Sequence, residues 1–339
     1  MEKRVTIVDI ARLARVSPAA VSLALNDRPG ISDRTRARIL LIVEKRKFVP
    51  NQNARRLLLR STGNIGVVHD EALSPLKQLF LIDILNAAMA SCEREGYNLL
   101  FSALHRNEEQ GLPAIVRRRE VDGLLVIGEV GSAFARAVRE TGLPYVLVDE
   151  HQRTPNAVAV EADYRAGAEA AVSHLIESGH KRIGYVGESP EGSYGRQTLE
   201  GFERGLRIRS LRASASYVRT EAFGASDATA QACAGRLLAL KTPPTAIFCA
   251  ADIYAVGVLR AVAERGLKVP RDVSVIGMDD ILLDQYVTPP LTTVGFPAEQ
   301  MGVAAVQTLL SMVRGRYDGP TKVIFAGSLV ERSSVAPPR

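Results

Sequence analysis

The stretch TIVDIARLARVSPAAVSLALN, residues 6–26, determines how the first part of the chain folds. Its apolar side chains recur at helical spacing in two short blocks, which predicts two helices separated by only about three residues. Thr6 with Asp9 matches a variant capping box, and Ser17 followed by Pro18 is a typical helix start. The pattern predicts a helix-turn-helix, although an αα-corner inside a helical domain has the same spacing.

The residues around this pair of helices bear on the choice between the two interpretations. Arg15 occupies the turn position that glycine usually holds, so the turn must accept a less permissive residue. A third helix is expected over residues 32–48. The apolar side chains that this helix offers to cover the first two are Ile39, Leu40, Val43 and Phe48.

The charge of the chain is concentrated in this first part. Residues 1–62 hold 14 Lys and Arg against 5 Asp and Glu, a net charge of +9, whereas the rest of the chain has a net charge of −3. Positive charge of this density indicates a polyanion partner. A merely solvated charged surface is the alternative, but the excess coincides with the helix-turn-helix, which favours double-stranded DNA as the partner.

After residue 63 short apolar strands alternate with amphipathic helices, which predicts parallel α/β sheets. The first series of strands and helices covers residues 65–68, 79–95, 98–101, 108–119, 123–128, 132–141 and 144–149. A second series begins at NAVAV and covers residues 156–160, 164–178, 182–187, 196–207, 216–220, 226–240, 245–250, 252–265 and 273–279. Two such series of similar size predict two doubly wound lobes with a cleft between them.

Several longer motifs follow one another in a characteristic order along almost the whole chain. They are VTIVDIARLARVSPAAVSLALN (5–26), VPNQNARRL (49–57), NIGVV (64–68), HLIESGHKRIGYVG (174–187), PPTAIFCAADIYAVGVLRAVAERGLKVPRDVSVIGMDD (243–280) and PPLTTV (289–294). In these motifs the chain resembles the lactose-repressor (LacI/GalR) family of bacterial transcription regulators. The resemblance implies a small all-α head and an α/β body of two doubly wound parallel-sheet lobes, like that of periplasmic binding proteins.

The same resemblance implies where the parts of the chain begin and end. The head is expected at 1–48, a hinge helix or linker at 49–62, and a ligand-binding and dimerisation body at 63–339. Within the body, we expect a first lobe formed by residues 63–160 and 291–324 and a second lobe formed by residues 161–290 and 325–339. Helix 297–313 is expected to return the chain to the first lobe.

The resemblance also implies which residues of the head meet DNA. Pro18, Ala19 and Leu23 stand where relatives contact base edges, but none of them can make the paired hydrogen bonds that Arg makes to guanine or Asn to adenine. Small apolar residues can still contact a thymine methyl group. Arg15, Arg28, Arg34 and Arg36 are candidates for phosphate contacts, although each of them is equally compatible with a solvated surface position. The candidate DNA-binding residues of the head are Thr6, Ser17, Pro18, Ala19, Ala20, Ser22, Leu23 and Arg28.

The hinge carries a more specific prediction. Residues 51–59 can form one short helix that is marginal in water, so we expect it to form when two copies pack together on DNA. Leu57 matches the family's leucine that enters the minor groove and kinks the duplex. Packing of Leu57 on the body is the alternative. The candidate DNA-binding residues of the hinge are Asn51, Ala54, Arg55 and Leu57.

Polar or aromatic residues follow several of the expected strands, where doubly wound folds bind ligands. In the family the positions of Asp149 and Asp279 commonly meet hydroxyl-rich ligands, whereas for Asp252 and Asp280 a helix-cap or turn role is favoured. Two family anchors are missing, because Thr198 replaces an arginine and Ala251 replaces an asparagine. A sugar or purine ligand is therefore in doubt. The candidate effector residues are Asp70, Asp149, Tyr194, Arg196, Thr198, Phe223, Ala251 and Asp279.

Other classes of protein find little support. Residues 187–191 fall short of a G-x-S-x-G nucleophile elbow, no phosphate-binding loop follows a strand, and the five histidines have no metal-ligand spacing. No signal peptide or membrane span is evident, and Cys92, Cys233 and Cys249 fit reduced buried thiols. We therefore expect no cofactor, no metal and no enzymatic activity.

The overall prediction is a cytoplasmic homodimeric repressor. It would bind a pseudo-palindromic operator and respond to a small-molecule effector of sugar-like or altered specificity in the cleft between the lobes. One alternative is a DNA-binding regulator whose cleft is vestigial or answers to a protein partner. A second is a binding protein or an enzyme built on the same lobes, and the basic head argues against it.

Overall fold

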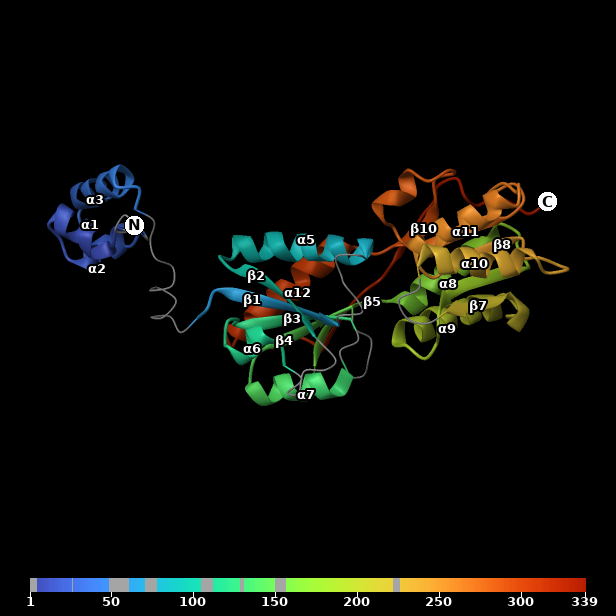
Figure 1. Ribbon diagram of the computed structural model, residues 1–339, viewed down its shortest axis with the longest axis horizontal. Helices are drawn as coiled ribbons and strands as arrows, with labels where there is room; N and C mark the ends of the chain where they lie inside the picture. The colour runs from blue at the N-terminus through green and yellow to red at the C-terminus, as the bar shows by residue number, and fades with distance from the viewer. Residues whose placement is uncertain are drawn as a thin grey trace. The chain divides into compact units, whose positions relative to one another are not determined.

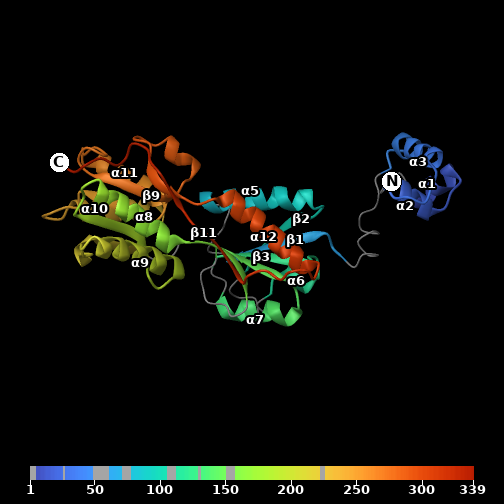
Figure 2. The same ribbon diagram turned by 180° about the vertical axis from the view of Figure 1, so that it is seen from behind.

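The structure is a computed structural model that describes residues 5–25, 27–48, 61–70, 78–104, 112–128, 131–149, 157–221 and 226–339, without the side chains of Asp70, Gly131 and Ser132. Its contacts divide the chain into two compact units, Met1–Thr62 and Gly63–Arg339 (Figures 1 and 2). We refer to them as the head and the body, and each is described by itself.

The head contains the three helices that the sequence predicts, α1 (Ile7–Ala14), α2 (Pro18–Leu25) and α3 (Asp33–Lys45). Thr6 caps α1 in a complete capping box, because its Oγ1 accepts the backbone N–H of Asp9 and the Asp9 carboxylate accepts the N–H of Thr6. Ser17 Oγ accepts the N–H of Ala20 at 3.2 Å and so caps α2. Arg15 adopts a left-handed conformation with φ 51°, which explains why glycine is usual at this position.

The core of the head joins all three helices. Its buried side chains are Ile10, Ala11, Ala14, Val21, Ala24, Ile39 and Phe48. The prediction that Leu40 covers α1 and α2 was wrong, since Leu40 is 42% exposed. One residue of helix turns the side chain by about 100°, so the neighbour of the fully buried Ile39 points away from the core.

The first sheet of the body is parallel throughout, with strand order β11-β5-β4-β3-β1-β2. The helices α5 (Leu79–Arg94) and α12 (Ala298–Val313) pack on one face and α6 (Ala114–Arg117) and α7 (Gly131–Thr141) on the other (Figure 1). The strands are β1 (Asn64–Asp70), β2 (Asn98–Leu104), β3 (Gly123–Ile127), β4 (Tyr145–Val148), β5 (Val158–Ala162) and β11 (Lys322–Phe325).

The second sheet has the order β12-β10-β9-β8-β6-β7 and is parallel except for its edge strand β12. The strands are β6 (Ile183–Glu188), β7 (Val218–Glu221), β8 (Ala246–Cys249), β9 (Ser274–Asp279), β10 (Thr292–Gly295) and β12 (Ser328–Val330). The helices are α8 (Tyr164–Glu177), α9 (Ser193–Ile208), α10 (Asp227–Leu238) and α11 (Asp252–Glu264), with the short 3₁₀ helices η2 (Ala215–Tyr217) and η3 (Leu282–Gln285). Helices α8 and α9 pack together, as do α10 and α11.

The assignment of strands to the two sheets agrees with the expected lobe boundaries for β5 and differs from them for β10. Strand β5, which the sequence pattern counted as the start of the second series, completes the first sheet, and most of it lies within the expected bounds 63–160 of the first lobe. Strand β10 belongs to the second sheet, although residues 291–295 were assigned to the first lobe. Helix α12 then returns the chain to the first sheet as predicted. The strand pattern alone does not reveal these assignments, because buried parallel strands look alike in either sheet.

Helix α6 is shorter than the sequence predicts. The helix expected at 108–119 is α6, which covers only 114–117, and residues 105–111 lie outside the described part. Among the described residues, no helix combines the length and apolar character needed to cross a membrane.

Candidate DNA-binding surface and effector site

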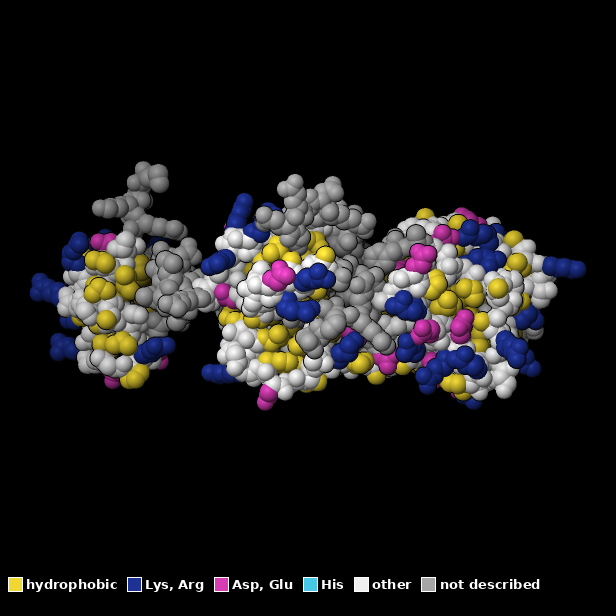
Figure 3. All heavy atoms as spheres, turned by 90° about the horizontal axis from the view of Figure 1, so that it is seen from below, with side chains coloured by type: hydrophobic (Ala, Val, Ile, Leu, Met, Phe, Trp, Pro, Cys, Tyr) yellow, Lys and Arg dark blue, Asp and Glu magenta, His cyan; other side chains and the backbone are white. Residues whose placement is uncertain are grey.

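The outer side of α2 is short and largely apolar. Pro18, Ala19 and Ser22 are exposed, and Ala20 and Leu23 are half-buried. Leu23 lies beside Gly30, where a Cβ atom would stand 3.2 Å from its Cδ1 and where φ is +120°. Glycine at residue 30 therefore lets the loop after α2 pass close to this leucine. On the face in Figure 3, most charged side chains of the head are Lys and Arg.

Arg36 has a structural role instead of the predicted phosphate contact. Its guanidinium donates to the carbonyl oxygens of Leu23, Ala24 and Arg28 at 3.2, 3.4 and 2.6 Å. It also pairs with Asp27 at 3.0 Å, and its side chain is only 18% exposed. These carbonyls lie at the end of α2 and just after it, so Arg36 caps this helix and is not available to DNA.

The other candidate arginines of the head, Arg15, Arg28 and Arg34, have exposed side chains. Their positions agree with a phosphate-contacting role as well as with plain solvation. The hinge candidates Asn51, Ala54, Arg55 and Leu57 lie outside the described residues, so their roles stay predictions.

In the body, three of the carboxylates at strand ends lie close enough to act on one another. Asp149 follows β4 in the first sheet, and Glu188 and Asp279 end β6 and β9 in the second. The Tyr164 hydroxyl donates to Asp149 Oδ2 at 2.7 Å, and the Tyr254 hydroxyl donates to Glu188 Oε1 at 2.6 Å. The first of these bonds links the end of a first-sheet strand to α8, which packs on the second sheet. We call this region the lobe junction.

Aromatic rings line the same junction. Tyr164 contacts Tyr194 edge to face with ring centroids 4.7 Å apart, and it contacts Phe296 in the same way at 5.1 Å. The Tyr194 hydroxyl donates to the carbonyl oxygen of Ala250 at the end of β8. Tyr164, Glu188 and Tyr254 were not among the predicted site residues. Glu188 could have been found, because it ends the strand RIGYVGE and strand ends were the criterion.

The charges at the junction act on one another. Burial raises the pKa of Asp279 well above its usual range, and the carboxylates of Asp252, Asp149 and Glu188 raise it further. Burial and the neighbouring carboxylates also raise the pKa values of the Tyr164 and Tyr194 hydroxyls. These tyrosines therefore stay neutral at physiological pH and remain hydrogen-bond donors.

Two predicted effector residues point into the core instead. Thr198 is fully buried, and its Oγ1 lies 2.8 Å from the Tyr185 hydroxyl. Ala251 is 8% exposed and serves as the N-cap residue of α11. Neither side chain lies where it could meet a ligand without rearrangement. An arginine at position 198 would have to enter the core, so restoring the family's arginine there is expected to destabilise the fold.

The structure describes only some of the remaining predicted effector residues. Arg196 is exposed on α9 and Asp279 is partly exposed. Asp70 ends β1, but its side chain is not described, and Phe223 lies outside the described residues.

Asp252 organises the turn that follows Asp279, in agreement with the predicted turn role. Its fully buried carboxylate accepts the N–H groups of Asp280 and Ile281 at 2.7 and 3.3 Å and the Thr293 hydroxyl at 2.7 Å. Asp279 has φ 129° and Asp280 has φ 63°, conformations that favour glycine. The bonds to Asp252 thus stabilise a strained turn that positions Asp279. Asp280 itself pairs with Arg332 at 2.6 Å.

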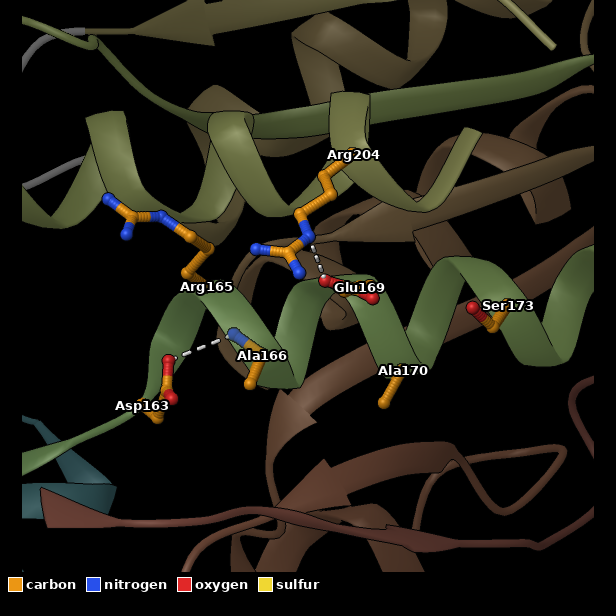
Figure 4. A pocket seen from close by; sticks show the side chains of 7 residues that line it. All are labelled: Asp163, Arg165, Ala166, Glu169, Ala170, Ser173 and Arg204. Atoms are coloured by element: carbon orange, nitrogen blue, oxygen red, sulfur yellow. Dashed lines mark hydrogen bonds and ion pairs between the residues drawn. The ribbon is translucent and has the colours of Figure 1, made fainter. Parts of the chain in front are cut away.

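A separate surface pocket of about 480 Å³ lies between the outer sides of α8 and α9 (Figure 4). Glu169 and Arg204 form an ion pair across it at 2.9 Å. None of the predicted effector residues lines this pocket. The described residues also contain no group of three or more His, Cys, Asp or Glu side chains arranged to hold a metal ion.

A helix-turn-helix head and a body of two doubly wound lobes on the same polypeptide are typical of ligand-responsive DNA-binding regulators. Comparison with known proteins agrees with this class. Residues 6–51 match the family described as bacterial regulatory proteins, lacI family, and residues 172–335 match the periplasmic binding protein-like domain. The probable HTH-type transcriptional repressor ExuR of Bacillus subtilis is 31% identical, with 98% of each chain covered. The chain therefore belongs to the LacI family of bacterial transcriptional regulators.

Other relatives give the same result. The ribose operon repressor of Haemophilus influenzae is 28% identical, over 97% of this chain and 98% of that one. Among solved structures, the Lac repressor dimer bound to operator and the anti-inducer ONPF has a TM-score of 0.84 and 25% identity, and it covers 98% of this chain and 100% of that one. The repressor-like function and the fold predicted from the sequence are confirmed.

Proposed function

We propose that the protein represses transcription as a homodimer on a pseudo-palindromic operator and that a small molecule at the lobe junction controls this binding. The proposal rests on the hydrogen bond from Tyr164 of the second lobe to Asp149 of the first, and on the closeness of Asp279 to the same tyrosine. A ligand that contacts both lobes there favours one lobe orientation and so changes the relation between the two heads of the dimer. We place the protein in the cytoplasm and assign it no enzymatic activity and no cofactor.

The junction favours an effector with several hydrogen-bond donors. Asp149, Glu188 and Asp279 contribute acceptors, and the tyrosines contribute hydroxyl groups that stay neutral. A hydroxyl-rich or amine-bearing molecule fits this chemistry. Relatives named for ribose and for the lactose operator support a sugar-like compound, although the arginine and asparagine anchors of the family are absent here.

A second candidate is a regulator whose junction binds no small molecule and is vestigial or answers to a protein partner. It is favoured by the bonds from Tyr164 and Tyr254, which already satisfy two of the carboxylates within the protein. A thermal-shift screen with sugars, nucleosides, amino acids and amines separates the two candidates. A ligand at 100 times its Kd adds about 2.7 kcal/mol to the free energy of unfolding. A hit that also changes operator affinity supports the effector, and no hit in any class supports the second candidate.

Exposed apolar side chains suggest which face of the body forms the dimer. Leu282 and Tyr286 in and after η3 are 67% and 74% exposed, and Ile253 at the start of α11 is 37% exposed. The N–H of Ile281 bonds to Asp252, so η3 lies near the start of α11, and exposed apolar side chains that gather in one region are typical of subunit interfaces. Tyr286→Arg should shift the protein from dimer to monomer in analytical ultracentrifugation. Ile208→Arg changes another exposed apolar residue, on α9, and should leave the dimer intact.

A further inference from the structure

The eight residues of α2, PAAVSLAL, contain no charged side chain, no amide and no aromatic ring. The exposed members of the helix are Pro18, Ala19 and Ser22, so carbon atoms make up most of its outer surface. The Ser17 hydroxyl, just before the helix, is bonded to the N–H of Ala20. The surface that α2 offers to a partner is thus small, shallow and mostly apolar.

This surface is held firmly in place. Val21 and Ala24 are buried against the other helices, and Arg36 fixes the carbonyl end of α2. Leu23 lies beside Gly30, where any side chain would crowd it. A rigid helix loses less conformational entropy on docking than a flexible segment does. Its apolar surface therefore binds a surface of matching shape more tightly.

In a helix-turn-helix the second helix lies in the major groove, with its N-terminal residues at the base edges. Hydrogen-bond readout there needs Arg or Lys for guanine and Asn or Gln for adenine, and α2 has none of these. The apolar feature that the major groove offers is the C5-methyl group of thymine. Ser22 can hydrogen-bond to more than one base and so discriminates little.

We infer that α2 recognises its operator mainly through thymine C5-methyl groups, which pack against Pro18, Ala19 and the exposed edge of Leu23. The inference rests on the proposed function as an operator-binding repressor. The net charge of +9 on residues 1–62 supplies affinity for phosphates without sequence information. The operator half-site under α2 is then rich in thymine at the positions that α2 contacts.

The test begins with operator selection by the full-length protein from random duplexes. Each thymine of the selected sequence is then replaced in turn by deoxyuridine, which keeps every hydrogen-bonding group and removes only the methyl group. One buried methyl is worth roughly a fourfold change in Kd, and the same change in both half-sites about 16-fold. Replacing a sensitive thymine–adenine pair by cytosine–guanine should weaken binding, and 5-methylcytosine at that position should recover about fourfold.

A double-mutant cycle assigns the contact to a residue. Ala19→Gly removes the methyl of Ala19, so the sensitive thymine and its deoxyuridine counterpart should bind this variant with nearly equal Kd. The cost of glycine to the helix is the same on both duplexes and cancels in the cycle. Ala37→Gly makes the same change on the exposed side of α3 and should keep the fourfold preference for thymine.

The outcomes are distinct. Kd values within 1.5-fold for every deoxyuridine duplex, together with a large loss when guanines are replaced by 7-deazaguanine, would overturn the inference and show hydrogen-bond readout. A methyl effect that persists in Ala19→Gly and also in Leu23→Ala would overturn the assignment to α2. Selection that enriches no sequence over random DNA would instead refute the proposed repressor function itself.

Discussion

Asp284 gives the sharpest prediction, because it is fully buried and neither of its carboxylate oxygens has a hydrogen-bond donor as its partner. Burial, the charge of Asp252 and a hydrogen bond to Asp252 together raise the pKa of this carboxyl to about 10, against the lowering effect of Arg332. Asp284 is therefore protonated in the folded protein at neutral pH and donates its proton to the Asp252 carboxylate. A neutral acid in this place explains the missing donors.

The size of the effect follows from proton linkage. The unfolded chain releases this proton near the ordinary pKa of 3.8, whereas the folded protein keeps it to about pH 10. Because the folded state binds one more proton within this window, the free energy of unfolding falls by about 1.4 kcal/mol for each unit that the pH rises. The contribution of Asp284 to stability is thus highest at the acidic end of this window, and the step from pH 6 to pH 8 removes about 2.7 kcal/mol of it.

Asp284→Asn tests the assignment. Asparagine has the same shape, carries no titrating proton and can donate an N–H to Asp252, so the variant should lose this pH dependence. Its advantage over the wild type should grow by about 2.7 kcal/mol between pH 6 and pH 8. Urea unfolding of the full-length protein followed by circular dichroism measures this, since the chain has no tryptophan. Asp318→Asn, at an exposed position, is the matched control and should follow the wild type.

If the wild type and Asp284→Asn lose stability in parallel from pH 6 to pH 8, Asp284 does not hold its proton in the folded state. The carboxyl would then be ionised and hydrated through a rearranged η3, and the network around Asp252 would need another explanation.

Four further outcomes are expected. Leu57→Ala should weaken operator binding and reduce DNA bending in a gel-shift bending assay, and unchanged values would place Leu57 on the body. Asp279→Ala should lower effector affinity 10- to 150-fold by calorimetry while operator binding stays intact, and equal affinities would show that the site is elsewhere. Thr198→Arg should lower the free energy of unfolding by roughly 2–4 kcal/mol, because a charged chain would enter a fully buried position, and a wild-type melt would contradict that. Arg36→Ala should destabilise the head by about 2 kcal/mol. Unchanged stability together with a weaker salt dependence of DNA binding would restore its phosphate role.

Local signals in the sequence predicted the head well. The capping box at Thr6, the cap at Ser17 and the start of α2 at Pro18 all appear in the structure, since these features depend on residues three or four positions apart. Arg36 was misread because its partners lie across a turn, at Leu23, Ala24 and Arg28. A guanidinium is equally suited to phosphates and to helix-end carbonyls, and only the packing of α3 against α2 decides between them.

The body shows the same limit on a larger scale. Strand positions could be predicted from apolar runs, but the sheet to which β5 and β10 belong depends on contacts with strands far along the chain. Thr198 was counted as a cleft residue by its place in a motif, whereas the phase of α9 turns its side chain towards Tyr185. Tyr164 and Tyr254 were missed because they lie in helices, while their hydroxyls reach carboxylates at strand ends.

Tyr164 and Tyr254 limit the affinity that an effector can gain from the carboxylates of the lobe junction. A cationic anchor would bind a ligand oxygen directly, but here neutral hydroxyls already donate to Asp149 and Glu188. A ligand gains from these carboxylates only if its own donors replace the tyrosine bonds, and an even exchange of hydrogen bonds yields little net free energy. Most of the affinity must then come from Asp279, whose pKa is kept raised by burial and by the other carboxylates. A ligand amine or a cluster of hydroxyls favours ionised Asp279, so binding at this junction should release a proton and should tighten as the pH rises.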